Sequence, residues 1–79
     1  MSDTAEKIME LFRKHDKVKT GLVLTATELS FKSSDWEPSD FSRLDSALEE
    51  LSSAGYIIVT PSLGLELTDK GYSFLFDEI

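Results

Sequence analysis

The sequence predicts one α+β domain over residues 1–79, in which helices come first, a β-hairpin follows and a short helix comes last. Two observations carry this prediction. Apolar residues recur at helical spacing in residues 39–54, and the pattern stops at Gly55, a residue type that commonly ends helices. Directly afterwards, two strand-like runs (56–60 and 65–68) flank a turn that contains Pro and Gly.

Size and composition exclude several classes of site. The chain has 79 residues, no Cys and one His, so a disulfide, a thiolate zinc site and a cysteine nucleophile are excluded. We therefore expect no metal and no cofactor.

No apolar run approaches the about 20 residues that a membrane span requires. The first residues also lack the basic and then apolar pattern of a secretory signal. We expect a cytoplasmic protein that does not engage a membrane.

The formal net charge of −7 is unevenly distributed along the chain. Residues 1–20 hold five Lys and Arg against four Asp and Glu, whereas residues 21–79 hold three against eleven. Affinity for nucleic acids comes largely from Lys and Arg that neutralise phosphates. The acidic body therefore counts against strong DNA binding, although a high net charge also simply keeps a small protein in solution.

The first helix is expected over residues 4–15. Its buried face should consist of Ala5, Ile8, Met9 and Phe12. The spacing of Asp3 and Glu6 is that of a capping box. A basic cluster follows, formed by Arg13, Lys14, Lys17 and Lys19. These residues either complement the negative end of the helix dipole or contact a phosphate or a partner. We expect His15 to be a solvated residue at the helix end.

A short strand is expected at residues 22–24 and a second helix directly after it. The T-x-x-E run at 25–28 has the form of a capping box, so the helix should begin near Ala26. Pro38 separates this helix from the third, because the residue before a proline avoids helical geometry. Trp36 lies between the two helices. It either stacks on a ligand or, as we favour, fills the corner between the helices.

The third helix is expected at about residues 40–54, with Ser39 or Asp40 as its cap. Its buried stripe should consist of Phe41, Leu44, Ala47, Leu48 and Leu51. After the hairpin, Thr68 and Asp69 can cap a last helix. One face of that helix carries Tyr72, Leu75, Phe76 and Ile79, while Phe74 points elsewhere.

This element order resembles the winged helix-turn-helix superfamily over about residues 5–76. Three motifs carry the resemblance. The run F-S-R-L at 41–44, with the leucines behind it, resembles the recognition helix of the multiple-antibiotic-resistance type of repressor. G-Y-I at 55–57 resembles the entry into the wing. L-T-D-K-G at 67–71 resembles the L-T-x-K-G that follows the wing in those repressors and in PadR-like regulators.

The resemblance implies a small transcriptional regulator whose third helix enters the major groove of DNA, with the wing on the backbone or minor groove. The candidate nucleic-acid-binding residues are Ser42, Arg43 and Ser46, with phosphate contacts from Lys14, Lys17 and Lys19. Glu49 and Glu50 fit this role poorly, because carboxylates repel phosphates. The turn at 61–64 also lacks the basic residue that DNA-binding wings usually carry.

The alternative is a winged-helix protein–protein interaction module. In this hypothesis the acidic third helix, with Glu49 and Glu50, and the uncharged wing meet a basic protein partner. The resemblance also allows a homodimer, for which Phe74 and the Leu11 side of the first helix are candidates, unless Phe74 packs on the edge of the core. A fold does not determine a function, so duplex DNA and a basic protein both stay open as partners.

Catalysis is not expected. The sequence contains no phosphate-binding loop, no dinucleotide fingerprint, no nucleophile elbow and no H-E-x-x-H motif. The neighbouring carboxylates on the third helix belong, by their spacing, to a solvated helix face. We therefore expect a binding protein and not an enzyme.

Overall fold

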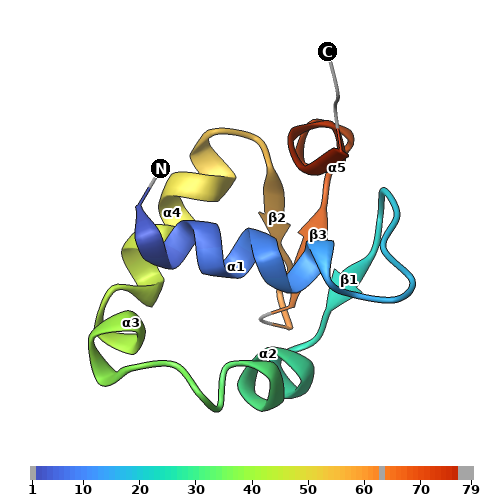
Figure 1. Cartoon of the computed structure of the whole chain (residues 1–79). Coiled ribbons are helices and arrows are strands. Elements are labelled where there is room, and N and C mark those ends of the chain that lie inside the picture. The colour runs from blue at the N-terminus through green and yellow to red at the C-terminus, as the bar shows by residue number, and fades with distance from the viewer. Residues whose placement is uncertain (1, 63, 77–79) are drawn as a thin grey trace.

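The computed structural model describes residues 2–62 and 64–76, which form five helices and a three-stranded antiparallel sheet. The elements, in chain order, are α1 (Asp3–Arg13), β1 (Val23–Leu24), α2 (Ala26–Lys32), α3 (Pro38–Ser42), α4 (Leu44–Ser53), β2 (Ile57–Val59), β3 (Leu65–Leu67) and α5 (Asp69–Phe76). The predicted α+β class is confirmed, and this combination of elements is compatible with a winged helix. In Figure 1, α1 crosses the middle of the molecule, with α4 and α5 above it and α2 and α3 below it.

The sheet has the strand order β1-β3-β2, so β3 is central. Glu66 of β3 is paired with Val23 on one side and with Ile58 on the other. The predicted hairpin between β2 and β3 is confirmed, and the backbone N–H of Thr60 donates to the carbonyl of Gly64 at 2.8 Å across its turn. Leu63, which the sequence places in this turn, lies outside the described residues.

Helix α1 has the predicted buried face but a different cap. Its apolar face of Ala5, Ile8, Met9 and Phe12 is inaccessible to solvent or nearly so. The helix begins with Ser2 as its cap, because the Ser2 hydroxyl accepts the N–H of Ala5 at 3.2 Å. The predicted capping pair of Asp3 and Glu6 is therefore wrong. Both carboxylates instead lie in the first turn, where they complement the helix dipole.

Helix α2 begins at Ala26, as predicted from the T-x-x-E run. The Thr25 hydroxyl accepts the N–H of Glu28 at 3.1 Å, which is the contact expected of an N-cap. The helix nevertheless buries no side chain completely. Leu29 packs against the core only in part. Helix α2 therefore has a good N-cap in its own sequence, but the rest of the domain buries little of it.

The residues predicted as one third helix form two helices. Arg43, at the break between α3 and α4, has φ −101° and ψ 1°, outside helical geometry. Helix α3 is capped by Glu37, not by Ser39 or Asp40, and Pro38 is its first residue. Glu37 is extended, with ψ 154°, so the predicted effect of Pro38 is confirmed.

The predicted buried stripe is correct only in the α4 half. Ala47 and Leu51 are buried, and Leu44 and Leu48 are half-buried. Phe41, in contrast, is 46% exposed. The break at Arg43 changes the orientation of α3, so that Asp40 points inward and Phe41 does not.

The hydrophobic core lies where α1, α4 and the sheet meet. Among the described residues, its buried apolar side chains are Ala5, Ile8, Met9, Phe12, Leu24, Ala47, Leu51, Ile57, Leu65 and Leu67. Within the described residues, α2 and α3 add none to this set, and α3 buries only Asp40. The core therefore lies on the sheet side of α1.

The L-T-D-K-G run fastens α5 to the end of α4. The Thr68 hydroxyl lies 2.5 Å from the Gly55 carbonyl and 2.9 Å from that of Tyr56, and it accepts the N–H of Gly71 at 3.0 Å. The Lys70 ammonium donates to the carbonyl of Ala54 at 2.6 Å. Gly55 has φ +85°, the left-handed conformation expected after a helix. A Cβ at Gly71 would lie 2.2 Å from the carbonyl oxygen of Tyr56, so only glycine fits.

Candidate partner-binding surfaces

The exposed face of α4 is acidic. The helix contains three carboxylates, those of Asp45, Glu49 and Glu50, and no Lys or Arg. Ser46 and Glu49 are exposed. Glu50 is half-buried, and its carboxylate accepts the backbone N–H of Ser2 at 3.2 Å. Glu49 is thus presented to solvent, whereas Glu50 also holds the beginning of α1.

Ser42 and Arg43 lie at the break between α3 and α4, not inside one recognition helix. The Ser42 hydroxyl donates to the carbonyl of Ser39 at 2.9 Å, so its proton is used within α3. The Arg43 side chain is exposed and faces the space between α3 and α1. Ser46 follows on the first turn of α4. The three predicted DNA-reading residues are therefore distributed over the end of α3, the break and the first turn of α4, and do not form one helix face.

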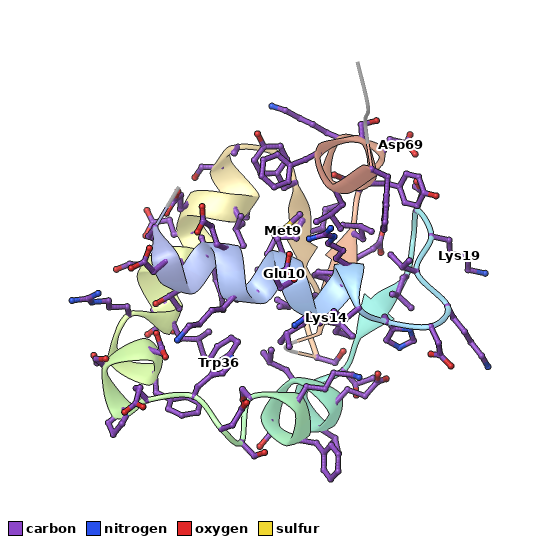
Figure 2. All side chains as sticks on the ribbon, in the orientation of Figure 1. Met9, Glu10, Lys14, Lys19, Trp36 and Asp69 are labelled. Carbon is purple, nitrogen blue, oxygen red and sulfur yellow. The ribbon has the colours of Figure 1, made fainter. Side chains whose placement is uncertain are left out.

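The predicted phosphate-contacting lysines do not gather beside α4. Lys14 follows the last residue of α1, and its ammonium lies 3.9 Å from the Glu10 carboxylate. Lys17 and Lys19 are exposed in the connector between α1 and β1. Figure 2 shows Lys19 on the opposite side of the molecule from α4. The structure therefore does not bring these lysines together with Ser42 and Ser46.

The hairpin tip carries no charge among its described residues, and strand β2 beside it exposes apolar side chains. Pro61 and Ser62 are exposed at the tip, and Ile58 and Val59 are exposed on β2. An uncharged tip cannot neutralise phosphates. It suits contact with a protein surface better than contact with the DNA backbone.

Phe74 is 48% exposed and rests against one aromatic ring. Its ring centroid lies 4.8 Å from that of Tyr56, so it is neither part of the core nor free of it. A second aromatic pair, Tyr72 and Phe76, also lies on α5, at 4.9 Å. Leu11, the other predicted dimer residue, faces a groove beside Trp36 and does not extend the Phe74 patch. Ile79 of the predicted α5 face lies outside the described residues.

A groove that the sequence did not predict lies between α1 and residues 31–43. We call it the Trp36 groove; its apolar lining is Leu11, Phe31 and Trp36, and its volume is about 860 Å³. Figure 2 shows Trp36 between α1 and the segment that joins α2 to α3. The Trp36 ring centroid lies 6.0 Å from that of Phe41, and Trp36 packs against the edge of the core. The predicted corner position of Trp36 is therefore confirmed, although the corner is not filled.

Asp40 lines the Trp36 groove and joins α3 to α1. It is 6% exposed, and its carboxylate accepts hydrogen bonds from the Lys7 ammonium at 2.5 Å, the Glu37 N–H at 3.1 Å and the Thr4 hydroxyl at 3.4 Å. The hydrogen bond from Lys7 is the main reason why the pKa of the Asp40 carboxyl lies below its usual value, against the opposing effect of desolvation. Asp40 is therefore ionised at neutral pH.

His15 connects α1 to α2, so the prediction that it is a solvated residue is wrong. Its side chain is 14% exposed and lies between two carboxylates, with Nδ1 3.4 Å from Asp16 and Nε2 3.5 Å from Glu28. Nδ1 also accepts the N–H of Lys17 at 3.0 Å, which places the ring proton of the neutral imidazole on Nε2, toward Glu28. One signal in the sequence bears on this contact. The T-x-x-E run places Glu28 in the first turn of α2, and from there its side chain faces His15.

Within residues 2–62 and 64–76, no group of three or more His, Asp and Glu side chains is arranged to hold a metal ion. No helix in that part of the chain is both long enough and apolar enough to cross a membrane. Comparisons with family models, with curated proteins and with solved structures found no match to this chain. The surfaces described above are therefore the basis for a functional proposal.

Proposed function

We propose that this chain is a non-catalytic winged-helix module whose α4 face binds a basic protein surface. The observation that carries the proposal is the exposed face of α4, which presents carboxylates and contains no Lys or Arg. A basic protein surface complements such a face, and complementary charges speed association and select partners.

The arrangement of the elements supports the winged-helix part of the proposal. A helix and a short strand precede the segment from α2 to α4, and a hairpin follows it, with the strand order β1-β3-β2. In this interpretation α4 takes the recognition position and the hairpin of β2 and β3 forms the wing.

Duplex DNA is the second candidate partner, because Arg43 and Ser46 are exposed near the start of α4. Two features argue against it. A phosphate backbone approaching α4 would meet Asp45 and Glu49, and the exposed Lys19 lies too far from α4 to compensate (Figure 2). We therefore favour the basic protein over DNA.

The test pairs a short arginine- and lysine-rich peptide with labelled duplex DNA, each titrated at low and at moderate salt. We expect the peptide to bind, and Glu49→Lys to weaken it by about tenfold, because a surface carboxylate becomes a repelling cation. Asp16→Lys is the matched control. It changes the net charge equally in the connector after α1, where the Asp16 side chain is 88% exposed, and it should retain the peptide.

Two results would overturn the proposal. The first is DNA binding that falls with salt at a log–log slope of about −0.9 per neutralised phosphate and is lost in Arg43→Ala. The second is peptide binding that Glu49→Lys and Asp16→Lys weaken equally, which would indicate attraction by net charge alone and no α4 site.

A further inference from the structure

We infer that the Trp36 groove is a docking site for a short basic peptide segment that inserts an apolar side chain between α1 and the α2–α3 connection. The inference rests on the proposed function in one respect, the basic character of the partner. It assigns a separate surface, on the side of α1 that carries α2 and α3.

The size and the lining of the groove support a binding site. Its volume of about 860 Å³ falls within the range of about 300–1,000 Å³ that is usual for binding pockets. Phe31 is 80% exposed at its edge, an unusual exposure for so large an apolar side chain. Trp36 presents a second aromatic side chain to the groove. Aromatic residues of this kind commonly anchor partner side chains, because they bury much apolar area with little loss of rotamer freedom.

The groove exists because the polar attachments of α2 and α3 to α1 lie far apart, while the segment between them is only partly packed against the core. Asp40 ties the beginning of α3 to Lys7, and His15 lies against Glu28 in the first turn of α2. Between these two attachments, most of residues 31–39 line the groove, Trp36 reaches only the edge of the core, and α2 buries no side chain completely. The space is thus a property of how these helices are anchored, and it leaves apolar side chains without a full set of neighbours.

The charges around the groove select a basic occupant. The groove is lined by six carboxylates and four cations. Two of the cations are engaged, Lys7 with Asp40 and Lys14 with Glu10. Within residues 2–62 and 64–76, two lining cations, Lys32 and Arg43, and four lining carboxylates form no ion pair. These carboxylates, which outnumber the free cations and leave the groove with a net negative charge, are those of Asp3, Glu6, Asp35 and Glu37.

Two of these carboxylates flank the proposed anchor point. Asp35 and Glu37 are exposed immediately on either side of Trp36. If an apolar side chain of a bound peptide packs on Trp36, the peptide residues on either side of it lie close to both carboxylates. Lys or Arg at those positions would form ion pairs, whereas Asp or Glu there would be repelled. The occupant is thus a segment in which an apolar residue is flanked by basic ones.

Trp36 provides a direct measurement, because it is the only Trp in the chain. Three short amidated peptides serve as probes. The leucine–lysine peptide has leucines placed among lysines, the leucine–glutamate peptide has glutamates in place of the lysines, and the third peptide has serines in place of the leucines. We expect a saturable blue shift of the Trp36 emission with the leucine–lysine peptide, because the bound leucine removes water from the indole. The other two peptides should bind at least about tenfold more weakly.

Two variants at the edge of the groove test its location. Phe31→Ser and Asp35→Lys each change an exposed side chain, so the fold should be retained, and each should weaken the leucine–lysine peptide by about tenfold. Ile58→Ser and Asp69→Lys are the matched controls. They make the corresponding apolar and charge changes at exposed positions outside the groove, and they should leave the affinity unchanged.

Three results would overturn the inference: no saturable shift with the leucine–lysine peptide, an equal response to the leucine–glutamate peptide, or unchanged affinity in both groove variants. The variant Glu49→Lys separates the two proposals. If it weakens binding of the arginine- and lysine-rich peptide by about tenfold while no probe shifts Trp36, the α4 proposal stands and the groove fails. If Trp36 responds as expected and Glu49→Lys has no effect on either peptide, the groove stands and the α4 proposal fails.

Discussion

The two sides of α1 are held in different ways. On one side, α4, the sheet and α5 bury apolar side chains together, and the Thr68–Gly71 turn binds α5 to the end of α4. On the other side, α2 and α3 are attached by polar contacts, of which the Asp40–Lys7 pair is the shortest, and by partly buried side chains such as Leu29. This difference assigns stability to the first side. It leaves the second side free to adjust to a partner, since regions with few buried apolar contacts open at low free-energy cost.

The largest expected effect comes from truncating one leucine on each side of α1. Leu51→Ala should lower the free energy of unfolding by about 2–5 kcal/mol, because it empties a position in the closed core. Leu29→Ala, on the half-covered α2, should cost only about 1 kcal/mol, because little of that side chain is enclosed. Urea unfolding measures both. Equal losses would show that α2 is as firmly packed as α4.

Replacing Gly71 should change the free energy of unfolding less, and the sign of that change is informative. By helix propensity alone, Gly71→Ala in α5 would stabilise the protein by about 0.5–1 kcal/mol. Because the added Cβ would lie 2.2 Å from the Tyr56 carbonyl oxygen, we expect a loss of about 2–3 kcal/mol instead. Ser73→Ala, at an exposed position of the same helix, is the control and should be nearly neutral. A more stable Gly71→Ala protein would mean that α5 is not held against Tyr56.

The smallest effect concerns Asp40 and pH. Because the pKa of its carboxyl is lower in the folded than in the unfolded protein, Asp40 contributes stability above the unfolded value of about 3.9. That contribution is lost as the pH falls through the folded pKa. The unfolding midpoints of the wild type and of Asp40→Asn should therefore differ at neutral pH and converge at acidic pH. Hydrogen exchange measures where the structure opens. Compared with the wild type, Asp40→Asn should exchange its backbone amides faster only in α3. A difference that persists at acidic pH would contradict this.

Local signals in the sequence were sufficient for most of the elements. The T-x-x-E run located the start of α2, Gly55 marked the end of α4, and Pro38 separated α2 from α3. Each of these depends on residues within one turn of one another. The buried face of α1 was also correct, because a single uninterrupted helix preserves its periodicity along its whole length.

Most of the errors share a physical cause, which is contact between residues far apart in the sequence; the exception is the cap of α1, where Ser2 and Ala5 are only three residues apart. The break at Arg43 accompanies the inward position of Asp40, which depends on Thr4 and Lys7 of α1. Periodicity alone extended the stripe to Phe41, since it carries no information about a buried carboxylate. The prediction of the candidate site was wrong for the same reason. The sequence could not indicate that Lys19 and Ser46 lie on different parts of the surface, nor that Trp36 borders a groove.

The order of the strands also has a consequence for how the domain forms. The Val59–Leu65 pair of the hairpin closes a short loop, whereas the Leu24–Leu65 pair joins β1 to the sheet across much of the chain. Since loop closure costs more entropy as the loop grows, the hairpin should pair before β1 does. Helix α2 follows β1 after one residue, so its docking is tied to this later step. The part of the molecule proposed to receive a peptide would then be the last to assemble during folding.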